Sequence, residues 1–173
     1  MAIPFNPLDL LNMLVVNYVD TRVIVTLDNL APDTAPIVGT NEGFKFRLRV
    51  QNTQSTVGGM RLKGLRCFLQ VGSIARLIVP PATLGTARST NDPTAAALPV
   101  GSEQSQFYLF LPDSNSGLDV NTTKLISDNF RGIAKLTPGT TKIQCSVFAE
   151  PDLDSLFPKN QGSFKGELEL KVQ

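Results

Sequence analysis

Hydrophobic and polar residues alternate in several segments after residue 20, and segment 43–52 (GFKFRLRVQN) does so almost without exception. The apolar positions of one parity are Phe44, Phe46, Leu48 and Val50. Successive side chains of a β-strand point to opposite faces, so this segment predicts a strand with an apolar inner face and a cationic outer face.

Several further segments show alternation or β-branched composition, with Gly, Pro, Asn and Ser between them. They are residues 21–28, 60–72, 74–79, 106–111, 124–136, 141–149 and 163–172. Within 60–72 the alternation changes parity at Gly64, which predicts a β-bulge. About eight or nine short strands predict an all-β fold, an antiparallel Ig-like or jelly-roll-like β-sandwich, over residues 21–173.

Residues 1–20 have a different pattern and predict a short N-terminal helix or arm. Asn6 and Pro7 followed by Asp9 are typical of a helix start, and residues 8–19 are apolar on nearly every side. Such a segment has to be covered, either by the chain's own sandwich or by another subunit. The absence of cations disfavours a lipid surface. The residues expected to dock are Leu8, Leu11, Leu14 and Val15.

The length of 173 residues is enough for one domain with its own core, and 42% of the residues are hydrophobic. No run of about 18 apolar residues is present, so we expect no membrane span. Residues 1–20 contain no cation ahead of their apolar stretch, so they do not resemble a secretion signal. The compartment stays open between the cytoplasm and a virion or extracellular assembly.

Two segments resemble parts of Ig-like modules of the bacterial or phage surface type. EGFKFRLRVQNT (residues 42–53) resembles a strand of such modules that follows a glycine-led turn. LTPGTTKIQCSVFA (residues 136–149) resembles the turn and strand near the end of fibronectin-type and bacterial Ig-like domains. The resemblance implies an Ig-like sandwich with a binding or structural role.

The charges fall into three blocks. Residues 1–42 contain five acids and one base, residues 43–91 contain eight bases and no acid, and residues 92–173 contain ten acids and seven bases. We expect the basic block to form a surface for an anionic partner, made by Lys45, Arg47, Arg49, Arg61, Lys63 and Arg66. The alternative is that these cations protect an exposed sheet and pair with acids of the same chain. Nucleic acid is a disfavoured partner, because Phe44 and Phe46 point inward and cannot stack on bases.

Few residues offer catalytic or metal-binding chemistry. The sequence contains no histidine, the commonest general base and metal ligand. Cys67 and Cys145 lie among inward positions and are expected to be buried free thiols, with a bridge between the sheets as the alternative. The loop DSNSGLDVN contains oxygen ligands that suit calcium, with an ordinary polar turn as the alternative; these ligands are Asp113, Asn115, Asp119 and Asn121. No other cofactor is expected.

These features predict a non-enzymatic structural or interaction protein. Its expected partner is protein, foremost another copy of itself, in a surface, virion or filament assembly. The alternative is a binding module for an anionic ligand such as an acidic glycan.

Overall fold

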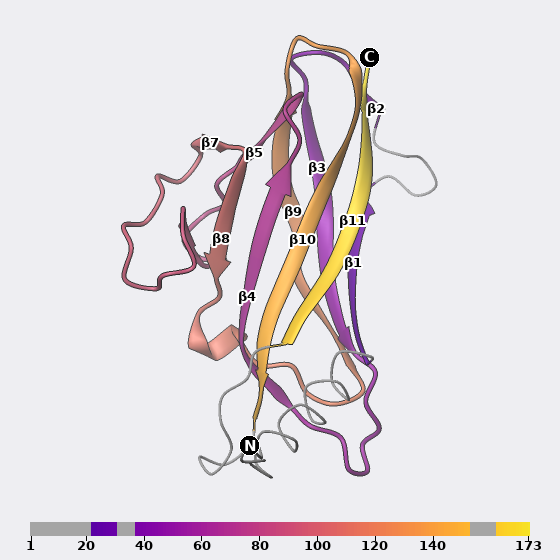
Figure 1. The fold of residues 1–173 in the computed structure, drawn as a ribbon, viewed down its shortest axis with the longest axis vertical. Coiled ribbons are helices and arrows are strands. Elements are labelled where there is room, and N and C mark those ends of the chain that lie inside the picture. The colour runs from indigo at the N-terminus through magenta and orange to yellow at the C-terminus, as the bar shows by residue number, and fades with distance from the viewer. Residues whose placement is uncertain (1–21, 31–36, 153–161) are drawn as a thin grey trace, which may run out of the picture.

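A computed structural model describes residues 22–30, 37–152 and 162–173, which form two sheets packed face to face (Figure 1). Sheet A contains, in spatial order, β1 (Val23–Asn29), β3 (Gly43–Asn52), β9 (Thr122–Ala134), β5 (Ala75–Ile78) and β7 (Glu103–Gln104). Sheet B contains β2 (Ile37–Val38), β11 (Gly162–Val172), β10 (Gly139–Pro151), β4 (Leu62–Val71), β8 (Gln106–Phe110) and β6 (Thr86–Arg88). The predicted antiparallel β-sandwich is confirmed.

The pairings are antiparallel except that of β2 with β11, which is parallel. The described residues form eleven strands, more than the eight or nine expected. The excess comes from β2, β6 and β7, which contain only two or three residues and are too short to show a periodic pattern.

The core lies between the two sheets and is built from the inward positions of the long strands. In β3 the four predicted inward side chains are all buried, and in β1 the inward positions are Val23, Val25 and Leu27. The largest side chains at the centre include Phe46, Phe107 and Phe130. The rings of Phe46 and Phe130 stack with their centroids 5.3 Å apart, so β3 and β9 are joined by ring packing as well as by their ladder.

Gly64 forms the predicted bulge in β4. Arg66 pairs with Phe148 of β10, and Lys63 pairs with Glu150, so β4 holds one more residue than β10 over this stretch. Gly64 has φ 62°, in the left-handed region that glycine adopts without a Cβ penalty. The extra residue explains why Leu62 and Leu65 are both buried despite their opposite parity.

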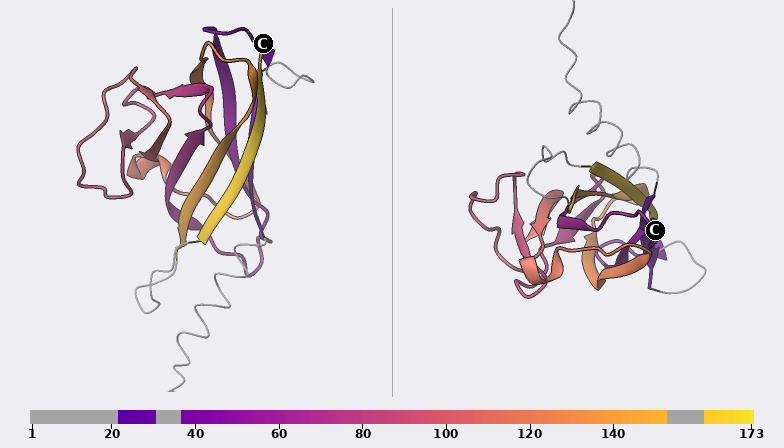
Figure 2. Two further views of the ribbon diagram at one scale, coloured as in Figure 1. Left: turned by 45° about the horizontal axis from the view of Figure 1, so that its top comes forward. Right: turned by 90° about the horizontal axis from the view of Figure 1, so that it is seen from below.

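One side of the sandwich is closed by contact between β1 of sheet A and β11 of sheet B. Gly166 of β11 permits this approach, because a Cβ at this position would lie 2.6 Å from the backbone oxygen of Val25. At the other side, residues 79–105 form the long connection between β5 and β8, which includes the short edge strands β6 and β7 and otherwise projects away from the sheets (Figures 1 and 2).

The helical content of the described residues is one short 3-10 turn, Asp113–Asn115. None of these residues forms a helix long and apolar enough to span a bilayer. The predicted N-terminal arm and its boundary at residue 20, with the docking residues Leu8, Leu11, Leu14 and Val15, lie outside the described residues.

Candidate binding surfaces

The six cations predicted to share one surface lie on two opposite faces of the sandwich. Lys45, Arg47 and Arg49 are on the outer face of β3 in sheet A, whereas Lys63 and Arg66 are in β4 of sheet B, with Arg61 just before it. The prediction of a single cationic surface is wrong, because β3 belongs to sheet A and β4 belongs to sheet B.

Three of the six cations are also neutralised by acids of the same chain. The ion pairs are Arg49 with Asp28, Arg61 with Asp119 at 2.7 Å and with Asp152 at 3.3 Å, and Lys63 with Asp152 at 2.7 Å. A hydrogen bond from Lys63, aided by the charges of Lys63 and Arg61, holds the pKa of Asp152 below its usual range. For these three cations the expected role in binding an anionic partner is therefore not supported. The alternative holds for them, because they pair with acids of the same chain.

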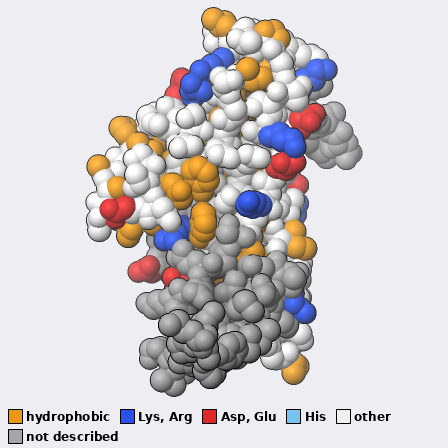
Figure 3. Space-filling model, in the orientation of Figure 1, with side chains coloured by type: hydrophobic (Ala, Val, Ile, Leu, Met, Phe, Trp, Pro, Cys, Tyr) orange, Lys and Arg blue, Asp and Glu red, His pale blue; other side chains and the backbone are white. Residues whose placement is uncertain are grey.

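Arg66 also belongs to a group of aromatic and arginine side chains on the outer face of sheet B. We call this group the aromatic–arginine array, and its members are Phe68, Tyr108, Phe110, Phe148, Arg66 and Arg88. The array spans four neighbouring strands, β10, β4, β8 and β6, and all its side chains are half-buried. Figure 3 shows hydrophobic side chains gathered where β4 and β8 lie on this face.

The members of the array contact one another in an unbroken series. The guanidinium of Arg66 lies 5.6 Å from the ring centroid of Phe148 and 5.9 Å from that of Phe110, and Arg88 lies 5.8 Å from the Phe110 ring. Tyr108 is 6.5 Å from Phe148 between ring centroids and 4.6 Å from Phe68. Cation–π contacts of this kind contribute about 0.5–1 kcal/mol each at exposed sites, so these contacts favour the observed arrangement of the side chains.

Sequence reasoning missed the array, although its signal was present. In QFYLFLP, Tyr108 and Phe110 share the parity opposite to the buried Phe107 and Leu109. Phe148 likewise follows the buried Val147. Large aromatic side chains at outward positions of several strands indicate a surface with a partner or a specific packing role.

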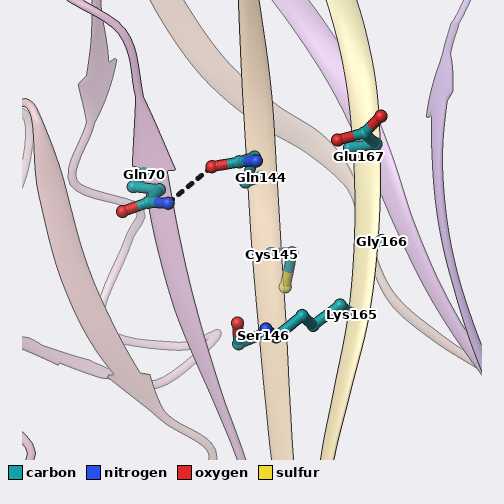
Figure 4. Close-up of a pocket in the computed structure, with 7 residues that line it drawn as sticks. All are labelled: Gln70, Gln144, Cys145, Ser146, Lys165, Gly166 and Glu167. Carbon is teal, nitrogen blue, oxygen red and sulfur yellow. Dashed lines mark hydrogen bonds between the residues drawn. The ribbon is translucent and has the colours of Figure 1, made fainter.

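Two depressions flank the array. One, of about 340 Å³, is walled by Gln70, Gln144, Ser146 and Lys165 over the backbone of β10 and β11 (Figure 4). Its wall residue Ser146 is the register partner of Phe68. There Gln70 Nε2 donates a hydrogen bond of 2.6 Å to Gln144 Oε1. The other, of about 420 Å³, is lined by residues that include Lys63, Arg66, Pro93, Phe110 and Glu150. An aromatic centre with polar flanks is the usual arrangement of a protein-binding patch.

The predicted calcium loop holds a lysine ammonium. Lys124 Nζ donates hydrogen bonds to the backbone oxygens of Asn115 at 2.8 Å and Gly117 at 2.6 Å. Burial lowers the pKa of Lys124, while the charge of Asp119 opposes this shift. Among the described residues, no group of three acidic, histidine or cysteine side chains is placed to hold a metal. Calcium at Asp113, Asn115, Asp119 and Asn121 stays a prediction that the nearby ammonium disfavours.

Cys67 and Cys145 are free and buried, as the first expectation stated. They lie on neighbouring strands of sheet B, and Cys67 pairs in register with Val147. The alternative of a bridge between the sheets is wrong, because both thiols belong to the same sheet. Burial, with a hydrogen bond to Cys67, raises the pKa of the Cys145 thiol well above its ordinary value.

A second group of cations lies on the outer face of sheet A. Lys45 of β3 and Arg131 of β9 are directly opposite each other in the ladder, and Arg76 of β5 stands two residues from Ile78, the partner of Arg131. Sequence reasoning missed Arg131, because its position beside Lys45 depends on the pairing of strands far apart in the chain.

Several solved domains align with most of this chain at low sequence identity. A cohesin module from a family 33 glycoside hydrolase of Clostridium perfringens aligns with a TM-score of 0.49 and 10% identity, covering 88% of this chain and 97% of that one. The CARDB domain of a Pyrococcus furiosus protein aligns with a TM-score of 0.42 and 11% identity, covering 87% of each chain. The collagen-binding subdomain of the Enterococcus faecalis surface protein ACE gives a TM-score of 0.40 and 10% identity, covering 86% of this chain and 95% of that one.

These alignments are no evidence of a shared function. A scan against protein-family models found no match, and a search of curated protein sequences also found none.

Proposed function

We propose that this chain is a non-enzymatic binding module that associates with further copies of itself, as a subunit of a surface, virion or filament assembly. The observation that carries the proposal is the aromatic–arginine array on the outer face of sheet B. Aromatic and arginine side chains contribute most to binding energy at protein interfaces. Here they are already ordered by contact with one another, so little side-chain entropy is lost on binding.

The segment that would dock on this array is residues 1–20 of a second copy. Its apolar residues Leu8, Leu11, Leu14 and Val15 suit an aromatic surface. It contains Asp9 and Asp20 and no cation, so its charge complements Arg88 of the array. When residues 1–20 of one copy dock on the array of the next copy, the contact joins two different surfaces. Such a heterologous contact produces rings or open filaments.

The non-enzymatic part of the proposal is supported by the chemistry of the chain. No histidine is present to activate a nucleophile. The two thiols are only 0% and 1% exposed, and a buried thiol of raised pKa is a poor nucleophile.

Light scattering after size-exclusion chromatography tests the proposal on the full chain. We expect oligomers whose size grows with protein concentration. Phe148→Ala on the array and Leu8→Asp with Leu11→Asp on the segment should each reduce association about tenfold or more, since an interface hot spot contributes at least 2 kcal/mol. Lys171→Ala, on the same sheet but away from the array, is the matched control and should change nothing.

A peptide of residues 1–20 should also compete and dissociate the oligomers. A chain that stays monomeric at every concentration contradicts the proposal. So does an oligomer that neither set of substitutions weakens.

A further inference from the structure

Three cations on neighbouring strands of sheet A form a second surface, separate from the array. We call them the cation triad: Lys45 on β3, Arg131 on β9 and Arg76 on β5. Lys45 and Arg131 are exposed, and Arg76 is half-buried. Lys45 directly opposes Arg131, and Arg76 lies diagonally from Arg131 on the next strand, so the three charges form a row that crosses the strands.

The residues that the structure describes do not neutralise the triad. Lys45 has no ion pair within the described ranges, Arg131 Nε donates to Asn129 Oδ1 at 3.4 Å, and Arg76 Nη1 donates to the backbone oxygen of Ala75 at 2.9 Å. Among the described residues, the strands of this sheet carry the acids Asp28, Asp128 and Glu103. Asp28 pairs with Arg49, and Glu103 stands opposite Ile78 and diagonally from Arg76 on the edge strand β7, without forming an ion pair with it. Like charges directly opposite each other destabilise a sheet, so the Lys45–Arg131 pair opposes folding unless an anion offsets it.

We propose that the cation triad binds an acidic glycan, a linear chain with carboxylate or sulfate groups. Neighbouring strands lie roughly 4.8 Å apart, so a polyanion crossing β3, β9 and β5 meets a cation on each strand. Arginine guanidinium groups bind carboxylate and sulfate oxygens through paired hydrogen bonds. The site is independent of the proposed self-association, which uses the opposite sheet.

The composition of this face disfavours nucleic acid and protein as its partner, which leaves a glycan as the polyanion that we propose. The side chains between the triad residues on this face are Ile78 and Ile133. Nucleic acid is disfavoured because the outward positions described on β1, β3, β9, β5 and β7 include no aromatic side chain on which a base could stack. A protein partner is disfavoured because this face has none of the aromatic anchors found on the array.

Binding of the full-length protein to heparin, measured by titration calorimetry at low and high salt, tests the site. We expect binding that weakens as salt is added, because exposed charges are screened. Lys45→Glu and Arg131→Glu should each weaken binding about tenfold, the loss of one charge-assisted hydrogen bond. Lys171→Glu, which changes the net charge equally on the opposite sheet, should leave binding within about twofold, because screening limits distant charges.

Thermal unfolding separates a binding role from a structural one. Lys45→Glu and Arg131→Glu each place opposite charges across the β3–β9 pair. The Tm of each variant should therefore stay the same or rise while heparin binding is lost. The proposal is overturned by absence of heparin binding at low salt, by equal loss in the Lys171→Glu control, or by tighter binding of single-stranded DNA or polyglutamate than of heparin. A triad variant that lowers the Tm as it weakens binding also overturns it.

Discussion

Gly64 is a position at which backbone conformation decides which residues are tolerated. Its φ of 62° is needed for the bulge that turns both Leu62 and Leu65 inward. No heavy atom lies within 4 Å of a Cβ added there, so space does not limit the side chain. A substitution at Gly64 therefore acts on backbone strain and not on packing.

We expect Gly64→Ala to lower the free energy of unfolding by about 1–2 kcal/mol, the cost of the left-handed conformation for a residue with a Cβ. Urea denaturation followed by circular dichroism measures this change. Gly43→Ala in β3 is the matched control, because Gly43 has no positive φ and its added Cβ would make an ordinary contact of 3.7 Å. Equal losses for both variants would contradict the role given to the Gly64 conformation.

Asp152 shows how one residue connects β10 to the start of β4. Its carboxylate accepts hydrogen bonds from Lys63 Nζ at 2.7 Å and Arg61 Nη1 at 3.3 Å. Its pKa is therefore lower in the folded chain than in the unfolded chain. The resulting stability is present above the unfolded pKa, near 3.8, and is lost as the pH falls through the folded pKa.

We expect Lys63→Gln to raise the pKa of Asp152 toward its ordinary value, because Lys63 is the main cause of the shift. Carboxyl carbon chemical shifts followed by NMR between about pH 2 and pH 6, a range around the usual aspartate pKa, measure the change. The variant should also lose less stability on acidification than the native chain. Lys171→Gln serves as the control, and a pKa of Asp152 that does not move would exclude this pair as the cause.

Among the elements, β9 links the sandwich to the loop before it through Lys124. The ammonium joins the backbone oxygens of Asn115 and Gly117 to the strand. The same loop is joined to β4 by backbone hydrogen bonds between Leu62 and Leu118 of 2.8 Å and 2.9 Å. The loop is thus held from both sheets, with a cation at its centre.

We expect Lys124→Met to lower the free energy of unfolding by about 1–2 kcal/mol, because two backbone acceptors lose a charged donor. Hydrogen exchange at the Leu118 amide should become faster, whereas exchange in β11 should not change. Millimolar calcium should leave the Tm of the native chain unchanged, since the ammonium opposes a second cation there. A calcium-dependent rise in Tm would instead support the calcium loop predicted from the sequence.

The sequence predicts the long strands well because each has a local signal. Alternation in 43–52 identifies both faces of β3, and the change of parity at Gly64 identifies the bulge. Short strands such as β2 and β7 give no such signal. Their positions depend on the neighbouring strands with which they pair, β11 and β5. Local pattern therefore predicts the elements, but not all of the edges of each sheet.

The candidate sites are less predictable, because they depend on which strands become neighbours. Arg49 pairs with an acid 21 residues away, and Lys63 with one 89 residues away. The array joins four strands, and Arg131 opposes Lys45 only because β9 pairs with β3. The positions of charged residues along the sequence cannot show these contacts, because the order of strands in each sheet determines which residues lie next to a cation.

At the scale of the whole molecule, the two sheets present different chemistry to solvent. Sheet B carries the aromatic–arginine array, and sheet A carries the cation triad. The core separates the two surfaces, so substitutions on one face share no contacts with the other and their effects should be independent.

We therefore expect a double dissociation between the two faces. Phe148→Ala should reduce self-association and leave heparin binding unchanged, whereas Lys45→Glu should do the reverse. Light scattering and calorimetry on the same two preparations measure both properties. Parallel loss of both properties in either variant would show that the faces are not separate sites.

The edge strands of the two sheets limit the ways in which copies of this protein could associate. Three of the four terminal strands, β2, β6 and β7, offer only two or three residues, and the fourth, β1, lies against β11. These short or covered edge strands offer few free backbone N–H and C=O groups with which a strand of another molecule could pair. This disfavours the continuous strand addition that produces amyloid fibrils. Any lattice of these subunits would then depend on side-chain recognition, and a single point substitution could dissolve it.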